Sequence, residues 1–238
     1  MQIENEHSTS MVLVVDDDPL MRTFVREALE QARFTVCEAS NGAEAVEQCV
    51  AQRPDLVVMD VVMPVMNGFI ACSKIRESVT GARVPILIMN GLNDADSIAR
   101  AYKHGATDFI AKPMNPAILE HRVRYMLRGS TTLNALMRSE ARLGLAQRIA
   151  KIGNWEWHPS TGRFLASPEL CRLMGIRSQD FRETKEAFLE MVHVDDRDLV
   201  DRALQSILTE RKPCDIDHRI LLQHGGEFTV NLQAEGVF

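Results

Sequence analysis

Four short apolar runs in the first half of this chain each end in a charged or polar residue. The residues that end the runs are, in order, Asp16-Asp17, Asp60, Asn90 and Lys112. Between the runs, apolar residues recur at the three-to-four spacing of amphipathic helices. This alternation predicts a doubly wound parallel sheet, in which the carboxyl ends of the strands line one crevice. We therefore expect these side chains to converge on one site.

The predicted strand–helix units are regular along residues 11–128. The segment 56–59 is almost wholly apolar, as is typical of a central strand that is covered on both faces. Together the units predict an α/β fold with a five-stranded parallel sheet of the flavodoxin-like kind. The strands are expected at 12–15, 35–39, 56–59, 86–89 and 108–111, and the helices from Pro19, over 43–52, through Ile70 and Ile75, around 98–102 and over 116–127.

The chemistry of the expected site follows from its charges. Three carboxylates that share a crevice repel one another, so a divalent cation is expected between them, and carboxylate oxygens in a small site suit Mg²⁺. A carboxylate oxygen that attacks a phosphoryl group needs both negative charges screened, which Mg²⁺ and the Lys112 ammonium group supply. Such a transfer depends on positioning and electrostatics and needs no general base. The residues thus indicate phosphoryl chemistry on an aspartate.

This segment, residues 11–128, resembles the receiver domain of bacterial two-component response regulators. The resemblance implies that Asp60 is the phosphoacceptor, that Asp17 is a direct Mg²⁺ ligand and that Asp16 holds the metal through water. The backbone carbonyl of Val62 would be a further ligand. The implied phosphodonor is a sensor histidine kinase or a small acyl phosphate.

The resemblance also assigns switching positions, and one of them departs from the family. Lys112 is expected to pair with the phosphoryl oxygens, and Lys112-Pro113 is commonly a cis peptide in this family. Where the family has Thr or Ser after the fourth strand, this chain has Asn90, whose planar amide is larger than a hydroxyl group. Phe109 holds the position of the family's aromatic switch. We expect phosphorylation of Asp60 to survive while the coupled movement of Phe109 is weakened.

Two other interpretations account for some of the acidic residues. Asp16-Asp17-Asp18 before Pro19 is also a typical helix cap, but capping explains neither Asp60 nor Lys112. Phosphatases of the haloacid-dehalogenase type carry Asp-x-Asp after the first strand, which this segment fits superficially. That fold needs a further acidic pair beyond its lysine, and none follows Lys112 within the segment.

A helical linker is expected between the two halves of the chain. Gly129-Ser130 predicts a boundary, and residues 129–148 have helical character. Leu136, Leu143 and Ala150 lie seven residues apart, but polar residues occupy the companion positions, so a coiled coil is only weakly specified. On the helix before the linker, the basic residues Arg122, Arg124 and Arg128 are expected either to pair with acids of a second molecule or to form a solvated face.

From residue 149 the pattern becomes mixed α and antiparallel β. The expected elements are a strand at 155–157, a helix capped by Ser167, a longer helix over 197–211, and a hairpin of 214–222 and 228–235 around His224-Gly225-Gly226. Residues 147–157 and the stretch His193-Val194-Asp195-Asp196-Arg197 are similar to segments of PAS domains. The resemblance implies ligand sensing or dimerisation, and it predicts that residues 149–238 form a PAS domain that is one strand short at its C-terminal end.

The composition argues against nucleic-acid binding and membrane insertion and indicates the cellular compartment. A net charge of −6 provides no basic footprint for nucleic acid, and no run reaches the roughly 18 apolar residues of a membrane span. Residues 1–10 are a polar tail without the apolar core of a secretory signal. The five cysteines are scattered and never form a Cys-x-x-Cys pair, which favours a reducing cytoplasm.

The sequence therefore predicts a phosphoacceptor regulatory protein of a two-component phosphorelay, which is not itself an enzyme. A homodimer is expected through the receiver face, the linker helix or the PAS domain. The resemblance also points to a downstream diguanylate cyclase, phosphodiesterase or histidine kinase output. Two alternatives stay open: a scaffold that works without phosphorylation because of Asn90, and a regulatory fragment of such an enzyme.

Overall fold

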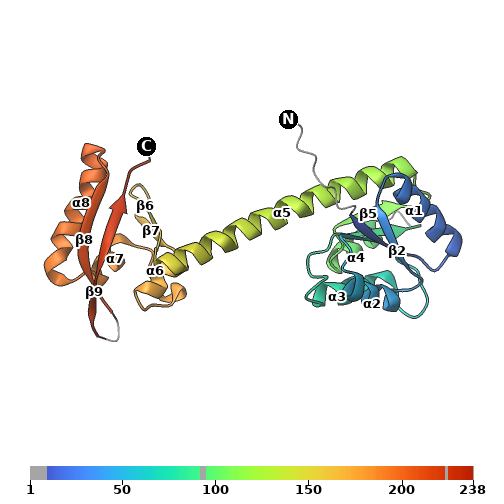
Figure 1. Ribbon diagram of the computed structural model, residues 1–238, viewed down its shortest axis with the longest axis horizontal. Coiled ribbons are helices and arrows are strands. Elements are labelled where there is room, and N and C mark those ends of the chain that lie inside the picture. Colours follow the sequence, from blue (N-terminus) through green and yellow to red (C-terminus); the bar gives the residue numbers. More distant parts are fainter. Residues whose placement is uncertain (1–9, 92–94, 223–224, 238) are drawn as a thin grey trace. The chain divides into compact units, whose positions relative to one another are not determined.

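The computed structural model describes residues 10–91, 95–222 and 225–237 (Figure 1). The polar tail over residues 1–9, and His224 of the predicted hairpin turn, lie outside the described residues. The chain divides into two compact units, Met1–Met137 and Arg138–Phe238. Among the helices of the described ranges, none has the length and apolar character needed to cross a bilayer.

The first unit is built on a five-stranded parallel sheet with strand order β2-β1-β3-β4-β5, which confirms the predicted fold class. Its strands lie within one residue of the predicted ranges. They are β1 (Met11–Val15), β2 (Thr35–Ala39), β3 (Leu56–Asp60), β4 (Ile86–Asn90) and β5 (Asp108–Ala111). The helices are α1 (Pro19–Gln31), α2 (Gly42–Gln52), α3 (Gly68–Glu77), α4 (Ala95–Lys103) and α5 (Pro116–Ala150).

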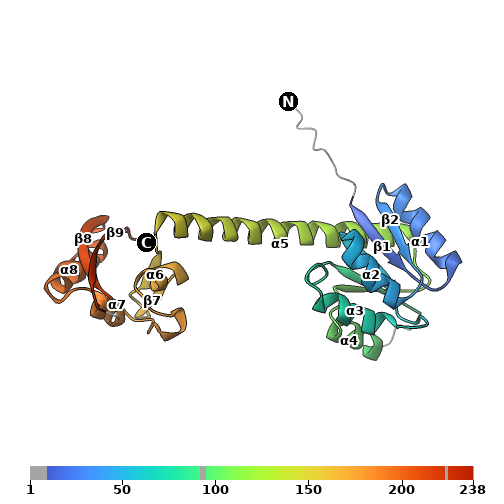
Figure 2. The ribbon, with the colours of Figure 1, turned by 60° about the horizontal axis from the view of Figure 1, so that its bottom comes forward.

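Two apolar layers cover the two faces of this sheet. On β1, Val12 and Val14 pack with residues of α1 and α5, whereas Leu13 and Val15 pack with residues of α2, α3 and α4. Figure 2 shows α2, α3 and α4 gathered on one side of the unit. The alternation follows from the two-residue period of a strand. Because both faces are covered, the open ends of the strands remain the place where polar side chains gather.

Helix α5 does not end where the sequence suggested. Gly129 and Ser130 lie inside one continuous helix of 35 residues, so the expected boundary is not a break in the backbone. Two basic residues of α5 make contacts within their own molecule that the sequence did not indicate. Arg122 pairs with Asp108 at 2.5 Å, and Arg124 donates to the carbonyl of Ala32 at 2.7 Å, so both are engaged within their own molecule.

The second unit combines short helices with antiparallel strands. Its elements are β6 (Trp155–His158), β7 (Arg163–Ala166), α6 (Pro168–Leu173), α7 (Lys185–Met191), α8 (Arg197–Glu210), β8 (Cys214–Leu221) and β9 (Glu227–Ala234), with short 3₁₀ turns at Ser178–Asp180 and Val194–Asp196. β6 pairs with β7, and β8 pairs with β9. The predicted cap at Ser167 is confirmed, since its hydroxyl accepts from the Leu170 N–H. Phe164 stacks on both Trp155 and Phe188, and the three rings form one cluster in the core.

The five cysteines are free thiols, and four of them are buried. Cys49 and Cys72 belong to the core of the first unit, and Cys171 and Cys214 are buried in the second unit. Burial raises the pKa of the Cys72 thiol to about 11, although Arg76 acts in the opposite direction. The Cys72 thiol is therefore held in the protonated form at neutral pH.

Candidate functional site

The polar residues at the strand ends of the first unit converge as the sequence predicted. Asp16 follows β1, Asp60 is the last residue of β3, and Lys112 follows β5. One carboxylate oxygen from each of Asp16, Asp17 and Asp60 lies within 4.8 Å of the others. Residues that are far apart along the chain therefore form one acidic cluster at the carboxyl end of the sheet.

Lys112 joins two members of this cluster. Its Nζ lies 2.7 Å from Oδ2 of Asp16 and 2.7 Å from Oδ1 of Asp60. The Asp16 side chain is 1% exposed and that of Asp60 is 9% exposed. Two buried carboxylates thus share one ammonium group, and the cluster keeps an excess of negative charge for a cation to balance.

The protonation states follow from burial and from this pairing. Burial raises the pKa of Asp60 above its usual range, and the hydrogen bond and charge of Lys112 oppose that rise without cancelling it. For Lys112, burial acts to lower the pKa, but the two carboxylates outweigh it and the pKa is raised. Lys112 therefore remains a cation beside the carboxylate that would accept a phosphoryl group.

The acidic loop after β1 is held by backbone contacts. The Asp18 N–H donates to Oδ1 of Asp16 at 3.0 Å, and Nη1 of Arg22 donates to the Asp16 carbonyl at 2.8 Å. The side chain of Asp18 caps α1 by accepting from the Leu20 N–H. The helix-cap interpretation therefore holds for Asp18, while Asp16 and Asp17 face the cluster. Sequence reasoning missed Arg22, whose place in the first turn of α1 was the available signal.

A glycine sets the geometry on the other side of Asp60. The Gly68 N–H donates to the carbonyl of Val61 at 2.9 Å, and a Cβ at Gly68 would come within 2.1 Å of the Asp60 carbonyl oxygen. Only glycine permits this approach. The Val62 N–H also donates to Oδ2 of Asp60 at 3.1 Å, which fixes the carboxylate. The start of α3 is thereby packed directly on the peptide of Asp60.

The two expected switch positions lie beside the cluster. Asn90 ends β4, is 4% exposed, and its carbonyl accepts from the Lys112 N–H at 2.8 Å. Phe109 is 9% exposed and belongs to the core beneath α4. A side chain at Gly91 would meet open space, which keeps the approach to the cluster clear. The peptide bond between Lys112 and Pro113 is cis, as the resemblance implied.

The donor set fits a hard divalent cation. Asp16, Asp17 and Asp60 offer only oxygen atoms, and Asp17 is exposed, so water has access to complete a coordination shell. Mg²⁺ characteristically binds through a few carboxylates and retains several waters. The residues present therefore suit Mg²⁺ better than a soft metal such as Zn²⁺, which prefers sulfur and nitrogen ligands.

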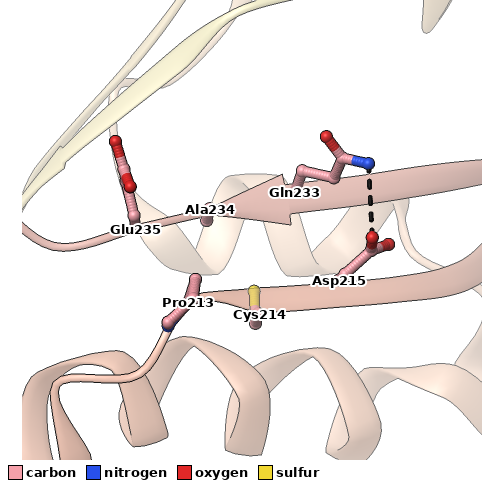
Figure 3. Close-up of a pocket in the computed structure, with 6 residues that line it drawn as sticks. All are labelled: Pro213, Cys214, Asp215, Gln233, Ala234 and Glu235. Atoms are coloured by element: carbon pink, nitrogen blue, oxygen red, sulfur yellow. Dashed lines mark hydrogen bonds between the residues drawn. The ribbon is translucent and has the colours of Figure 1, made fainter.

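The second unit presents a shallow pocket at one end of its hairpin. It is lined by Pro213, Cys214 and Asp215 at the start of β8 and by Gln233, Ala234 and Glu235 at the end of β9 (Figure 3). Gln233 donates to Asp215 across the two strands at 3.3 Å. Its lining offers no aromatic ring or basic group, and we assign it no ligand.

Asp196, in the stretch over residues 193–197 that resembles PAS domains, forms an ion pair with Arg219 of β8. Asp196 accepts two hydrogen bonds from the Arg219 guanidinium group and one from its backbone N–H. These bonds lower the pKa of Asp196 to about 2. The pair fastens the turn before α8 to β8, which is a structural role.

Comparison with known proteins identifies both segments. Residues 12–124 match the response regulator receiver domain, and residues 163–238 match the PAS fold. The chemotaxis protein CheY of Halobacterium salinarum is 40% identical over 110 residues, which cover 46% of this chain and 90% of that protein. A probable transcriptional regulator, ycf27, of Cyanidium caldarium is 31% identical over 140 residues, covering 58% of this chain and 55% of the relative.

Solved structures agree on the fold of the first unit. The signal receiver domain of a protein described as a LuxO repressor of Vibrio parahaemolyticus superposes with a TM-score of 0.51 at 20% identity, covering 54% of this chain and 97% of that one. The chain spans only about half the length of the ycf27 regulator, so the activity of that whole protein does not carry over. The chain belongs to the response regulator receiver family, and its receiver domain is followed by a PAS domain.

Proposed function

We propose that this protein accepts a phosphoryl group on Asp60 and acts as a phosphorelay switch. The observation that carries the proposal is the placement of Lys112 between Asp16 and Asp60, with Asp17 beside them. A carboxylate oxygen of Asp60 would attack the phosphorus atom of a phosphohistidine. The nitrogen–phosphorus bond would break, the imidazole would leave, and an acyl phosphate would form on Asp60.

Each residue of the cluster has a defined role in this proposal. Asp16, Asp17, Asp60 and the carbonyl of Val62 would hold Mg²⁺, which when bound screens the charge between the carboxylates and the incoming phosphoryl oxygens. Lys112 would release its contact with Asp60 and pair with a phosphoryl oxygen. The donor would be a sensor histidine kinase or a small acyl phosphate, and the compartment would be the cytoplasm.

The test is labelling by acetyl phosphate, read as the gain of one phosphoryl group in the intact mass. We expect labelling of the wild-type chain with Mg²⁺, none with EDTA, and none for Asp60→Asn. Asp96→Asn, which removes an exposed carboxylate on α4, is the matched control and should label like the wild type. Equal labelling of Asp60→Asn would overturn the assignment.

A scaffold that works without phosphorylation is the second candidate. The buried amide of Asn90, at the position where the family has a hydroxyl group, favours it. Beryllofluoride with Mg²⁺ imitates a bound phosphoryl group and separates the two functions. A switch should change hydrogen exchange in residues 95–111 when beryllofluoride binds, whereas a scaffold should bind it without any change in exchange or oligomeric state.

We further propose that the chain forms a homodimer through α5. Leu136 and Leu143 lie one heptad apart on this helix and are 56% and 58% exposed. Apolar side chains at this spacing are typical of a coiled-coil seam. Sedimentation equilibrium of the double variant Leu136→Lys/Leu143→Lys should show loss of the dimer, with the exposed pair Arg138→Lys/Arg142→Lys as the control.

The remaining assignments rest on the resemblance to the two families. We assign residues 11–128 to the receiver domain, 129–148 to a helical linker and 149–238 to a PAS domain. From the same resemblance we propose that the PAS domain is linked to an output domain, which would be a diguanylate cyclase, a phosphodiesterase or a histidine kinase. Phosphorylation of this chain would then regulate the activity of that output domain.

A further inference from the structure

Helix α3 touches the candidate phosphoacceptor at its first residue. Gly68 has no side chain and sits against the Asp60 carbonyl, so the start of α3 cannot move independently of that peptide. The side chain of Asn67 caps the helix by accepting from the Ile70 N–H at 3.0 Å. Any change at Asp60 that displaces the following loop therefore displaces the first turn of α3.

The next residue, Phe69, joins α3 to α4. Its ring is buried and lies nearly parallel to the His104 ring, with 5.6 Å between the ring centroids and an interplanar angle of 23°. The Arg100 guanidinium carbon lies 4.8 Å from the centroid of the Phe69 ring, at cation–π distance. Ser73, one turn further along α3, forms a 2.9 Å hydrogen bond with Nδ1 of His104. The Phe69 ring thus contacts Arg100 of α4 and His104, the residue that follows this helix.

The far end of α3 is fastened to the segment after α4. The Arg76 guanidinium group donates to the carbonyl of Gly105 at 2.8 Å and to Oγ1 of Thr107 at 3.2 Å. It also donates to the Val84 carbonyl at 2.5 Å. Gly105 has a φ of +92°, and a Cβ there would come within 2.8 Å of the Arg76 side chain, so glycine is required. With both of its ends fixed, α3 behaves as one rigid element between Asp60 and α4.

One of the two usual positions for coupling is altered in this chain. Asn90 replaces the hydroxyl group that would move towards a phosphoryl oxygen, and Phe109 is already buried beneath α4. The contacts of α3 with α4 do not use either residue. They provide a second physical connection between Asp60 and α4.

We propose that Phe69, through its contacts with His104 and Arg100, transmits phosphoryl occupancy of Asp60 to α4. The inference rests on the proposed function, because it assumes that Asp60 is the group that becomes occupied. Occupancy shifts the loop after β3, and Gly68 passes the shift to the Phe69 ring. Ring stacking and cation–π attraction fall off steeply with distance, since a gap of roughly 1 Å already forfeits up to about half of a dispersion contact. α4 must then follow the ring or lose these contacts.

The experiment compares hydrogen exchange of residues 95–111 with and without Mg²⁺ and beryllofluoride. The full chain is used, and ¹⁹F NMR of the bound beryllofluoride confirms occupancy in every sample. We expect a change in exchange for the wild type that falls to less than half in the double variant Arg100→Ala/His104→Ala. Lys103→Ala, an exposed neighbour on α4, is the matched control and should keep the wild-type change.

A second variant tests whether the loss of response comes from the missing ring contacts or from a general disturbance of the fold. Phe69→Leu keeps an apolar side chain in the core but removes the ring, and it should also lose most of the change while still binding beryllofluoride. If both variants keep the full wild-type change in hydrogen exchange, the inference is overturned. It is also overturned if the wild type binds beryllofluoride without any change in hydrogen exchange of α4. Failure of the wild type to bind beryllofluoride would instead overturn the proposed function.

Discussion

At the scale of single residues, the charge balance around Lys112 governs both the stability of the first unit and the chemistry proposed for Asp60. One ammonium group is shared by two buried carboxylates, 2.7 Å from each, so a negative charge is left over for a bound cation to balance. The sequence predicted this gathering because each residue stands just after a strand. It did not predict that the Lys112 ammonium group would contact Asp16 and Asp60 directly, because such contacts depend on side-chain reach within the folded crevice.

Replacing Lys112 should make the first unit depend on a divalent cation. Lys112→Met leaves Asp16 and Asp60 without their shared partner, so we expect the first unit to lose about 1–3 kcal/mol of stability in EDTA. Mg²⁺ should restore more stability to this variant than to the wild type, since it supplies the missing positive charge. Thermal unfolding with and without Mg²⁺ measures this, and Lys103→Met is the matched control. An equal Mg²⁺ effect in both proteins would contradict the expectation.

Asn90 is the residue at which this chain departs from its family. Asn90→Thr replaces a planar amide by a smaller hydroxyl group that can donate to a phosphoryl oxygen. We expect the variant to label on Asp60 like the wild type but to show a larger beryllofluoride-induced change in hydrogen exchange around Phe109. An unchanged response would show that the hydroxyl position does not limit coupling in this protein.

At the scale of elements, the strands were predictable and the length of α5 was not. Polar residues mark the end of each strand, so the strand ranges agree within one residue. Gly129 suggested a boundary because glycine weakens a helix by about 1 kcal/mol relative to alanine. The residues before it, Met126, Leu127 and Arg128, are good helix formers, and the helix continues through this local cost.

The start of α3 offers a sharp test of how elements are placed. Gly68→Ala puts a methyl group within 2.1 Å of the Asp60 carbonyl, so we expect a loss of about 1–3 kcal/mol and slower phosphorylation. Gly91→Ala is the control, because a methyl group there meets open space, and its stability should stay within about 0.5 kcal/mol of the wild type. Urea unfolding and acetyl phosphate labelling check both variants. A neutral Gly68→Ala would show that the contact with Asp60 is dispensable.

At the scale of the whole molecule, the two units carry different titratable and metal-binding groups. The carboxylate cluster belongs to the first unit. His218 is a buried imidazole of the second unit, 3% exposed, and neither of its ring nitrogens has a hydrogen-bond partner among the described residues. Burial lowers the pKa of His218 below its usual value, although the charges of Asp196 and Asp217 oppose this. His218 lies on the same face of β8 as Ile216 and Ile220, but a lone histidine in the sequence gives no signal that its ring is buried without a hydrogen-bond partner.

The units should therefore respond separately to Mg²⁺ and to pH. The unfolded chain takes up a proton on His218 near pH 6.5, whereas the folded unit does so only at lower pH. Stability of the second unit should thus be complete above pH 6.5 and fall below it, by at most about 1.4 kcal/mol per pH unit. The Asp196–Arg219 pair stays charged throughout this range, because the pKa of Asp196 is about 2. Mg²⁺ should raise the unfolding transition of the first unit alone.

Calorimetry between pH 5.5 and 7.5 checks this pattern. His218→Leu should remove most of the pH dependence of the second transition, and His158→Leu, at a half-exposed position on β6, should leave it unchanged. A pH dependence that persists in His218→Leu would assign it to another group.

The buried thiols allow the opening of each unit to be measured by chemical modification. A thiol reagent cannot reach Cys49 or Cys72 until the first unit opens, nor Cys171 until the second unit does. The rate at which these thiols are modified therefore reports spontaneous openings of each unit, without any introduced probe. Mass spectrometry of the modified peptides would then rank the two halves of the chain by how often each exposes its interior.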